Sequence, residues 1–486
     1  MRDLELHEPP SDWSDFKTVL FIGDLGQLKA LADSPALAPA ADALMPALDL
    51  LETKARRSDR LTLPLPEGRL EIVALATERG RMSCPARSDL FHKLAAPALQ
   101  RDGAVLALVA LEETSHAAAV ASAIARTLPL YHGGSKKKLL SPPVSLALLG
   151  PEGPLSGAAL DALTPRLQGI RQAARWVDMP PNEFNVSQFV DAAREVAARW
   201  GQAEGVEIDV ITGADVALTG LGGLAAVGQA ALEPPALVVL QGPRSAPDAP
   251  QTVWVGKGIC YDTGGLSLKG KTAMPGMKSD MAGAAAVLAA FDAACARGAH
   301  RDLAAVLCLA ENAIGPAAVR PDDIITLYSG KRVEVNNTDA EGRLVLGDGV
   351  AWAVQHLQPH TIIDLATLTG AQLVATGRRH AAIVCNDEAL EACAVRCGRE
   401  SGELVHPLPY APEFFLSEFK SKVADLRNSV ADRMNGQSSC AAHFVEAHLG
   451  EYQGRWLHID LAGPAVASGR GTGFGVGLLS TLLTEG

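Results

Sequence analysis

Residues whose types and spacing could do chemistry are concentrated in two stretches, and the more compact one is 336–344, NNTDAEGRL. It places Asp339, Glu341 and Arg343 within five positions, between a predicted strand and a predicted helix. We expect Thr338 or Asp339 to cap that helix, because free N–H groups at a helix N-terminus favour side-chain oxygens and negative charge. An ordinary capped helix would explain this stretch if it stood alone.

The second stretch, residues 252–296, contains the motifs GKG, YDTGG, LSLK and MKSDM in that order. Its charged residues include Lys257, Asp262, Lys269 and Asp280. Asp262 follows a predicted strand, and Asp280 precedes a helix-forming run of small and apolar residues. In an open α/β sheet, strand ends and helix starts of this kind converge on one edge, where ligands bind.

Together the two stretches supply four carboxylates, Asp262, Asp280, Asp339 and Glu341, which could not all stay ionised at one site without compensation. Two divalent cations would balance the four charges, and oxygen ligands suit manganese, magnesium or zinc. Such a metal pair polarises a carbonyl group and generates hydroxide from water. Lys269 and Arg343 could then stabilise an oxyanion or hold a small anion. Separate surface ion pairs would explain the same residues, and their spacing alone does not decide between the two.

The composition is that of a globular protein. The chain has 486 residues, which favours at least two domains, with 48% hydrophobic and 20% charged residues. A net charge of -12 argues against nucleic acid as a partner, since phosphate binding needs clustered basic side chains. The one basic run, Lys136-Lys137-Lys138, is predicted to be a solvated loop.

Several features favour a cytoplasmic location without a membrane anchor. The N-terminus has charges and prolines where a secretory signal would need an apolar run. We expect no apolar stretch to approach the roughly 20 residues that span a bilayer. The eight cysteines are interpreted as reduced thiols.

The alternation of strand-like and helix-like runs predicts an α/β fold throughout. We expect a smaller N-terminal α/β domain over residues 1–158 and a linker helix over 159–180. A larger catalytic α/β domain over 181–486 would have a mixed central sheet flanked by helices. The Pro- and Gly-containing stretch 142–157 marks the first boundary.

Three glycine-rich segments resemble nucleotide-binding loops. Residues 265–272, GLSLKGKT, match the phosphate-loop pattern, but Pro275 follows where the pattern requires a helix. Residues 220–223 lack the strand and the acidic residue of a dinucleotide site. The turn at residues 23–26 is interpreted as structural. None of the three is expected to bind a nucleotide.

The motifs GKG, YDTGG, LSLKG, MKSDM and NNTDAEGRLVLGD, in this order, resemble the leucyl aminopeptidase family of dinuclear zinc exopeptidases. GKTAMPGMK, CLAEN, RPDDI and NSVADR make the chain most similar to the aminopeptidase-like branch of that family. The resemblance covers roughly residues 175–486. Tyr261, Thr263 and the segment 427–440 depart from the commoner family pattern, which bears on substrate preference more than on chemistry.

The resemblance implies a set of metal ligands. Lys257 would bind through a neutral amine, and Asp262 would bridge two metals. Asp280 would belong to the first metal, Asp339 would bind the second by carboxylate and carbonyl, and Glu341 would bridge. The implied cofactors are two divalent ions per subunit, zinc or manganese with magnesium as a further candidate, and bicarbonate.

The resemblance also implies an activity. The enzyme would hydrolyse the N-terminal residue from peptides with a free N-terminus, using a bridging hydroxide. Lys269 would stabilise the oxyanion, and Arg343 would hold a bicarbonate that acts as general base. The active assembly would be a homohexamer, a dimer of trimers. The residues implied to contact substrate are Lys269, Met277, Asp280, Asp339, Thr367, Leu368 and Gly370.

Two other functions remain open at this point. One is a non-catalytic family member that acts as a scaffold or regulator, although it would be free to lose costly buried charges. The other is a two-metal phosphohydrolase, which also uses carboxylate pairs.

Overall fold

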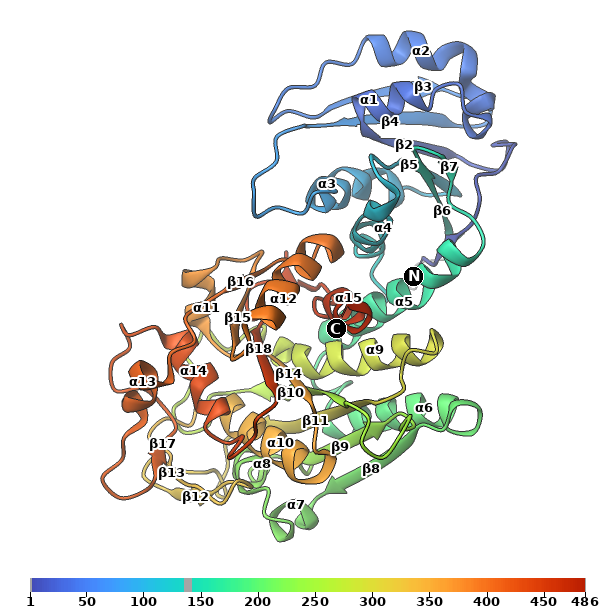
Figure 1. Ribbon diagram of the computed structural model, residues 1–486. Helices are drawn as coiled ribbons and strands as arrows, with labels where there is room; N and C mark the ends of the chain where they lie inside the picture. The colour runs from blue at the N-terminus through green and yellow to red at the C-terminus, as the bar shows by residue number, and fades with distance from the viewer. Residues whose placement is uncertain (1, 135–141, 486) are drawn as a thin grey trace. The chain divides into compact units, whose positions relative to one another are not determined.

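The computed structural model describes residues 2–134 and 142–485. The basic run Lys136–Lys138 therefore lies outside the described residues. The chain forms two compact units, Met1–Arg171 with Arg396–Leu404, and Gln172–Val395 with Val405–Gly486. Each is built on its own sheet (Figure 1).

The first unit is built on a seven-stranded sheet in the order β1-β6-β5-β2-β4-β3, with β7 beside β6. The strands from β1 to β4 in that order run parallel, and β3 and β7 are antiparallel to their neighbours. Their bounds are β1 Leu4–Leu6, β2 Thr18–Asp24, β3 Asp59–Pro64, β4 Arg69–Leu75, β5 Val105–Ala110, β6 Val144–Gly150 and β7 Gly153–Pro154.

Alternation along the strands gives this sheet two apolar faces. Val19 and Phe21 of β2 belong to one buried cluster, which also takes in residues of α1 and α2. Leu20 and Ile22 belong to the other, with residues of α3 and α4. The helices of the two faces are α1 Leu25–Ala30, α2 Ala41–Asp49, α3 Ser88–Leu99 and α4 Ala117–Ala125.

Residues 142–157 contain a core strand rather than a connecting segment. All seven residues of β6 are buried, and β6 pairs with both β1 and β5. The prolines lie outside its run VSLALLG, and Gly150 is the last residue of the strand. The predicted connecting helix follows as α5, Ala158–Asp178.

The second unit has an eight-stranded mixed sheet in the order β16-β15-β18-β14-β10-β11-β9-β8. The four central strands β18, β14, β10 and β11 are parallel, and antiparallel pairs join them to β15 and β9. The strand bounds are β8 Glu207–Thr212, β9 Ala236–Gln241, β10 Thr252–Asp262, β11 Leu303–Asn312, β14 Thr361–Ala366, β15 Ala381–Cys385, β16 Val405–Pro407 and β18 Arg455–Asp460.

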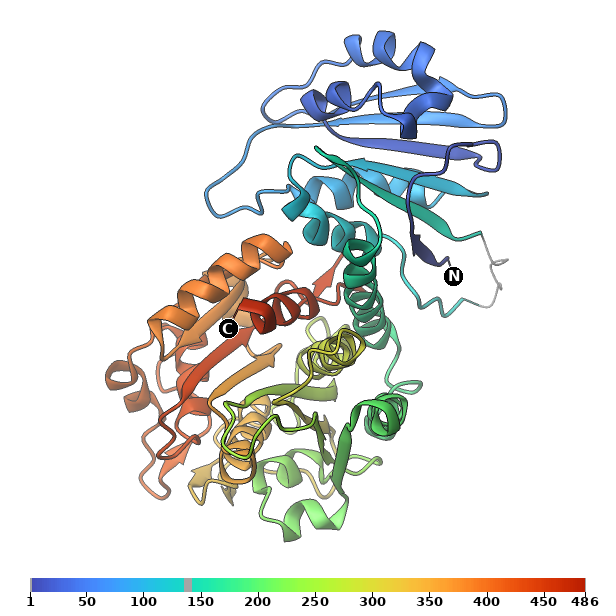
Figure 2. The same cartoon turned by 45° about the vertical axis from the view of Figure 1, so that its right-hand side comes forward.

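Helices cover both faces of this sheet (Figures 1 and 2). The helix α9 contacts β10, β11 and β14, and it packs with α6 and α15. The helix α10 contacts the same three strands, and it packs with α8 and α14. The helix bounds are α6 Val186–Glu204, α7 Ala214–Leu218, α8 Gly222–Gly228, α9 Ala282–Ala296, α10 Gly342–Leu357, α11 Gly370–Ala375, α12 Glu388–Ser401, α13 Pro412–Phe415, α14 Gln437–Glu446 and α15 Val476–Glu485. Short strands complete the unit: β12 Ile324–Thr326, β13 Arg332–Glu334, β17 Leu426–Arg427, β19 Val466–Ala467 and β20 Arg470–Gly471.

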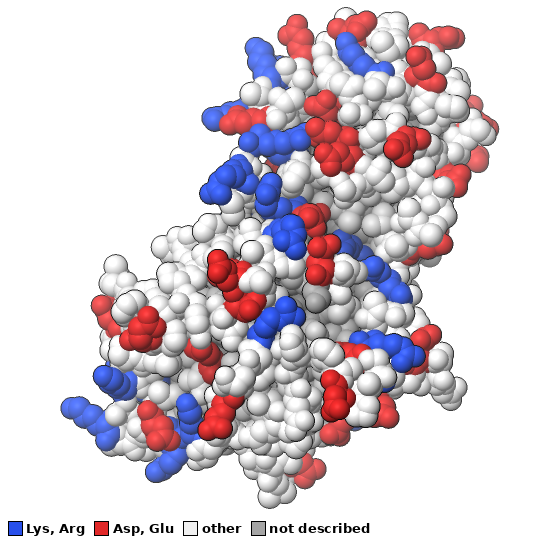
Figure 3. All heavy atoms as spheres, in the orientation of Figure 1, with Lys and Arg blue, Asp and Glu red and all other residues white. Residues whose placement is uncertain are grey.

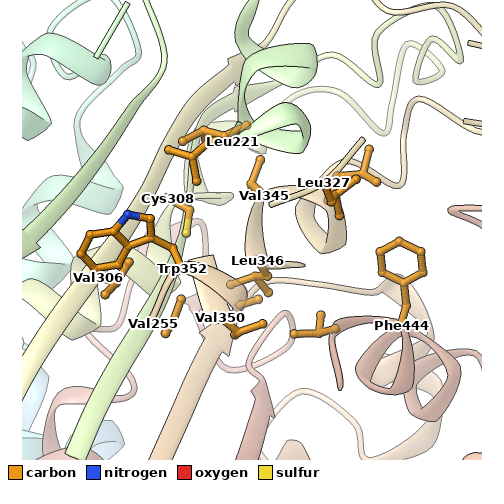
Figure 4. Packing of buried hydrophobic residues seen from close by; sticks show 14 of the residues in the cluster. Leu221, Val255, Val306, Cys308, Leu327, Val345, Leu346, Val350, Trp352 and Phe444 are labelled. Carbon is orange, nitrogen blue, oxygen red and sulfur yellow. The ribbon is translucent and has the colours of Figure 1, made fainter. Parts of the chain in front are cut away.

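Close packing fixes α9 and α10 against the sheet. A Cβ on Gly256 of β10 would lie 2.5 Å from the Cα of Ala284 in α9, so the two backbones touch. A Cβ on Gly349 of α10 would lie 2.3 Å from Cys308 Sγ of β11. The apolar cluster under α10 is shown in Figure 4 and includes Leu221, Val255, Val306, Cys308, Leu327, Val345, Leu346, Val350, Trp352 and Phe444. Because the interior is close-packed, each helix N-terminus has a fixed position over the sheet.

One expectation about apolar stretches was wrong. Residues 277–296 have the length and composition of a membrane span, with a mean hydropathy of 1.3. However, 83% of their most apolar window is buried inside the structure. This is the behaviour of a core helix, and most of the segment is α9.

Candidate metal centre

The charged residues of the two chemistry-bearing stretches meet at the carboxyl edge of the parallel strands in the second unit. Asp262 is the last residue of β10 and Asp280 lies two residues before α9, while Glu341 immediately precedes α10. All three are buried, and each offers a carboxylate oxygen within 4.8 Å of the others. Lys257 lies within β10, on the same strand as Asp262.

Two lysines each link a pair of carboxylates. Lys257 Nζ lies 2.8 Å from Asp280 Oδ2 and 3.0 Å from Glu341 Oε1. Lys269 Nζ lies 2.7 Å from Asp262 Oδ2 and 2.6 Å from Asp339 Oδ1. The structure thus brings together all four carboxylates and both lysines that the sequence singled out.

The acidity of these groups reflects their burial. Burial raises the pKa of Asp280 well above its usual value, and repulsion from Glu341 and Asp262 adds to this effect against the attraction of Lys257. The pKa of Glu341 is raised by burial and by Asp262. That of Asp339 is raised mainly by burial, although Lys269 opposes the shift. A site with this electrostatic balance favours the arrival of positive charge.

The lysines respond in the opposite sense. Burial by itself would lower the pKa of Lys257, but attraction by Asp280, Glu341 and Asp262 outweighs it and raises the pKa above its usual value. The pKa of Lys269 is raised in the same way by Asp262 and Asp339. Without another cation nearby, both lysines are therefore ammonium ions.

The helix cap predicted at Thr338 or Asp339 was wrong. The residue that precedes α10 is Glu341, and no side chain caps this helix. Thr338 Oγ1 instead donates to Gly264 O at 2.6 Å and accepts from Ser267 N at 2.7 Å, while Asp339 pairs with Lys269. Thr338 and Asp339 therefore bind the loop of Gly264, Ser267 and Lys269 instead of the helix N-terminus.

The loop itself depends on glycine. Gly264 has φ +84°, and a Cβ there would lie 2.8 Å from Asp339 Oδ1. The phosphate-loop pattern at 265–272 is not followed directly by a helix, since α9 begins only at Ala282. The structure therefore agrees with the interpretation that these residues are no phosphate loop.

Asn312 is a site residue that the sequence did not reveal. It ends β11, and its side-chain amide donates to Asp262 Oδ1 at 2.8 Å and to Thr338 O at 3.1 Å. Gly264 N also donates to Asp262 Oδ1, at 2.8 Å. Asp262 is thereby fixed in orientation. A usable signal was its place at the end of the motif CLAEN, on the strand beside β10.

Arg343 lies in the first turn of α10, and it is buried. Its Nη1 donates to Asn428 O at 3.0 Å and its guanidinium lies 5.9 Å from the Phe419 ring centre. Its Nε is buried without a hydrogen-bond partner among the described residues. Burial lowers the pKa of Arg343 to about 10. Asn428, also missed from the sequence, supports this region by accepting from Asn336 N at 2.9 Å and donating to Asn337 O at 2.7 Å.

The run that follows β14 approaches the same cluster. Thr367 O accepts from Lys257 Nζ at 2.9 Å, and Thr367 Oγ1 donates to Asp280 Oδ1 at 2.8 Å. Gly370 begins α11. Met277 begins the 3-10 turn Met277–Ser279 and is partly exposed beside Asp280 in the sequence.

The residues present fit hard divalent cations. The donors are carboxylate oxygens, and Glu341 Oε2 is buried with no hydrogen-bond partner in the part of the chain that the structure describes. Among the described residues, Asp262, Asp280 and Glu341 are the one group of three or more His, Cys, Asp or Glu side chains close enough to share an ion. The mixed sheet and this edge together define an α/β protein with a candidate metal centre at the carboxyl ends of its parallel strands.

Comparisons with known proteins identify the family. The family model described as cytosol aminopeptidase family, catalytic domain, matches residues 171–480. The probable aminopeptidase NPEPL1 of Homo sapiens is 48% identical over 419 residues, 85% of this chain and 79% of that protein. Leucine aminopeptidase 1 of Caenorhabditis elegans is 47% identical over 324 residues, 66% of this chain and 65% of that protein.

Solved structures agree over the whole chain. Leucyl aminopeptidase from Trypanosoma brucei in complex with bestatin matches with a TM-score of 0.89 and 34% identity, covering 100% of this chain and 96% of that one. Leucine aminopeptidase LAP1 of Caenorhabditis elegans matches with a TM-score of 0.90 and 35% identity, covering 100% and 98%. The chain belongs to the cytosol aminopeptidase family, and it is a hydrolase of the aminopeptidase type. The family resemblance and the α/β class expected from the sequence are confirmed.

Proposed function

We propose that this aminopeptidase cleaves the N-terminal residue from peptides with two divalent metal ions bound at the cluster of Asp262, Asp280, Asp339 and Glu341. The observation that supports this most is that two pairs of carboxylates, each pair linked by a lysine, meet in one cluster. Four acidic side chains need compensation, and two lysines balance only part of their charge. The proposed ligands are Lys257, Asp262, Asp280, Asp339 and Glu341.

Zinc or manganese, with magnesium as a third candidate, would supply a nucleophile from water at neutral pH and polarise the scissile carbonyl. Lys257 would contribute its amine as a ligand, which requires it to give up the proton that Asp280 and Glu341 now favour. Metal binding would then release a proton. Asp262 would keep its orientation during this exchange because Asn312 and Gly264 N hold it.

The chain's own residues perform the remaining tasks. Lys269 is the more exposed of the two lysines, with 15% of its side chain accessible against 3% for Lys257, so it can reach a substrate. We assign it to the carbonyl oxygen, where its charge stabilises the developing oxyanion. Arg343 would hold a bicarbonate that takes up the proton of the attacking water, consistent with its buried, unpartnered Nε.

Substrate would be held at the edge of the cluster. The residues proposed to contact the N-terminal residue are Lys269, Met277, Asp280, Asp339, Thr367, Leu368 and Gly370. A free α-amine near these carboxylates would explain cleavage restricted to chain ends. Because a relative's structure was solved with bestatin, we propose that bestatin binds this site as well. We further propose a homohexamer in the cytoplasm.

The test measures amino-acid release from leucine-p-nitroanilide by protein that has been stripped of metal and then reloaded with manganese or zinc. We expect activity only after reloading, about two ions per chain, and inhibition by bestatin. Asp339→Ala should remain folded, lose activity and bind less metal. Metal-dependent cleavage that persists in both Asp339→Ala and Glu341→Ala would contradict the assignment. A folded wild-type protein that binds metal but releases no amino acid would instead support a scaffold role.

A further inference from the structure

A buried carboxylate outside the metal cluster, that of Asp460, holds residues 367–370, the run that follows β14. Asp460 is the last residue of β18 and is 1% exposed. Its Oδ1 accepts from Leu368 N at 3.1 Å and from Ala462 N at 3.2 Å. Its Oδ2 accepts from Thr369 Oγ1 at 2.7 Å. The Asp460 carboxylate therefore binds the middle of the run 367–370 through the backbone of Leu368 and the side chain of Thr369.

The direction of these hydrogen bonds follows from the chemistry of the groups. An ionised carboxylate only accepts, so the Thr369 hydroxyl must donate to Asp460. Ser438 Oγ lies 2.8 Å from Thr369 Oγ1, and because the Thr369 proton is already used, Ser438 is the donor in that contact. Gln372 N also donates to Thr369 Oγ1, at 3.1 Å. The chain of donors from Ser438 through Thr369 to Asp460 has a single consistent polarity.

A second set of contacts joins the segment directly after β18 to α11. Gln372 is fully buried, and its Oε1 accepts from Gly463 N at 2.6 Å. Its Nε2 donates to Gly377 O at 2.9 Å and to His380 O at 2.7 Å. A Cβ at Gly463 would lie 2.6 Å from Gly377 O, so the two segments are in close contact. The segment after β18 thus fixes the position of the start of α11 through hydrogen bonds and close packing.

The position of the run matters because it reaches the metal cluster at its other end. Thr367, directly before Leu368, contacts both Lys257 and Asp280. A shift at Leu368 would move Thr367 and change how Asp280 is held. Asp460 makes no described hydrogen bond or ion pair with the proposed metal ligands, so its hydrogen-bonded connection to them passes through the run. Its negative charge also acts on Arg343, whose pKa it tends to raise against the effect of burial.

We propose that Asp460, acting through Thr369 and Leu368, is a positioning residue that sets the backbone of the substrate-contacting run. The inference rests on the proposed role of Thr367, Leu368 and Gly370 in binding the N-terminal residue. A charged acceptor makes a stronger hydrogen bond than a neutral one. The hydrogen bonds that hold Leu368 and Thr369 are therefore expected to need a carboxylate at position 460.

The decisive variant is Asp460→Asn. The amide keeps one oxygen for the N–H groups of Leu368 and Ala462, but it presents an NH₂ group to the Thr369 hydroxyl. The variant therefore loses the acceptor for the Thr369 hydroxyl, while the side chain at position 460 keeps nearly the same size and shape. We expect KM for leucine-p-nitroanilide to rise about 10-fold, as for the loss of one charge-assisted hydrogen bond, with a smaller change in kcat. The bound manganese should stay at the wild-type amount.

A second pair of variants keeps the inference testable if Asp460→Asn does not fold. Thr369→Val removes the hydroxyl while keeping the shape, and it should raise KM by a similar factor. Thr369→Ser restores the hydroxyl and should return KM to within about 2-fold of wild type, which a purely structural role for the methyl group would not produce. Ser480→Ala, which removes another buried hydroxyl bound to Val476 O at 2.7 Å in α15, serves as the control and should leave both constants unchanged.

The outcomes separate this inference from the proposed function. Wild-type KM in Asp460→Asn, or equal KM in Thr369→Val and Thr369→Ser, would overturn the positioning role while the enzyme itself stays active. A fall in kcat alone, at constant KM, would also overturn it. Absence of metal-dependent release by the wild-type protein would instead overturn the proposed function, and this inference with it.

Discussion

The two units of this protein share an architecture and differ in what they place at the carboxyl edge of the sheet. In the first unit, the ends of β2, β4 and β5 border a small pocket whose polar lining residues are Asp24, Arg79, Arg87, Glu112 and His116. Arg79 and Glu112 pair with each other and remain 36% and 40% exposed. In the second unit, the corresponding edge has a cluster in which Lys257, Asp262, Asp280 and Glu341 are buried.

The difference shows where the function of this protein lies. Both sheets have parallel strands with buried helices on each face, so layer architecture alone does not distinguish them. On the face drawn in Figure 3, acidic and basic side chains are interspersed over both units, so surface charge on this face does not distinguish them either. The distinguishing feature is burial of like charge, which costs stability and is retained only with a compensating partner.

The largest effect is expected at the metal cluster. Glu341→Gln keeps the size of the side chain but removes the charge of a proposed bridging ligand. We expect activity on leucine-p-nitroanilide to fall at least about 1000-fold, with loss of bound metal. Metal analysis and kinetics on the same preparation provide the measurement. Glu388→Gln, an exposed position in α12, is the matched control, and near-normal activity in Glu341→Gln would remove the basis of the comparison.

A somewhat smaller effect is expected for Lys269→Met. This variant removes the proposed oxyanion contact while keeping a long side chain, and kcat should fall about 100- to 1000-fold. Lys271→Met, in the exposed part of the same loop, should behave as wild type. Steady-state kinetics at saturating manganese tests this. Equal activity of the two variants would show that Lys269 does not take part in the chemistry.

A buried carboxylate outside the metal cluster allows the cost of burying a negative charge to be tested through the pH dependence of stability. Asp348 in α10 accepts from Tyr328 N at 2.7 Å and Leu224 N at 2.8 Å, and burial raises its pKa to about 7. Between pH 4 and 7 the folded state keeps a proton that the unfolded state has lost. The free energy of unfolding should therefore fall as pH rises through this window, by at most about 1.4 kcal/mol per pH unit from this group.

Urea unfolding of wild type and Asp348→Asn across that pH range measures the effect. The amide has no proton to lose, so the difference between the two proteins should change with pH in favour of the variant. Parallel pH profiles would mean that Asp348 titrates normally despite its burial.

The smallest effect is expected in the first unit. Glu71 is 1% exposed and pairs with Arg101 at 2.6 Å and Arg60 at 3.5 Å. Because both arginines are partly exposed, Glu71→Gln should lower the free energy of unfolding by only about 1–2 kcal/mol. We expect kcat to stay constant. Glu67→Gln, from the exposed pair with Lys17, should change neither quantity, and any loss of kcat in Glu71→Gln would show that charges of the first unit affect catalysis.

The sequence by itself indicated the candidate site residues and the order of the helices and strands around them. The run of small and apolar residues after Asp280 and the helical pattern after Glu341 predicted two helices, and α9 and α10 begin there. The motifs around Asp262, Asp280 and Glu341 predicted an acidic site at a sheet edge. These features are local, since each depends on residue types within about one turn or one strand.

Only the tertiary structure decided how that site is held together. Asn312 orients Asp262 across 50 positions, Asn428 meets Arg343 across 85, and Asp460 holds Leu368 across 92. Contacts with the loop of Gly264, Ser267 and Lys269 hold Thr338 and Asp339 away from the predicted helix cap. Strand pairing made β6 part of a sheet. Each partner is chosen by the register of neighbouring strands, and a single strand's residue pattern contains no record of which strand will lie beside it.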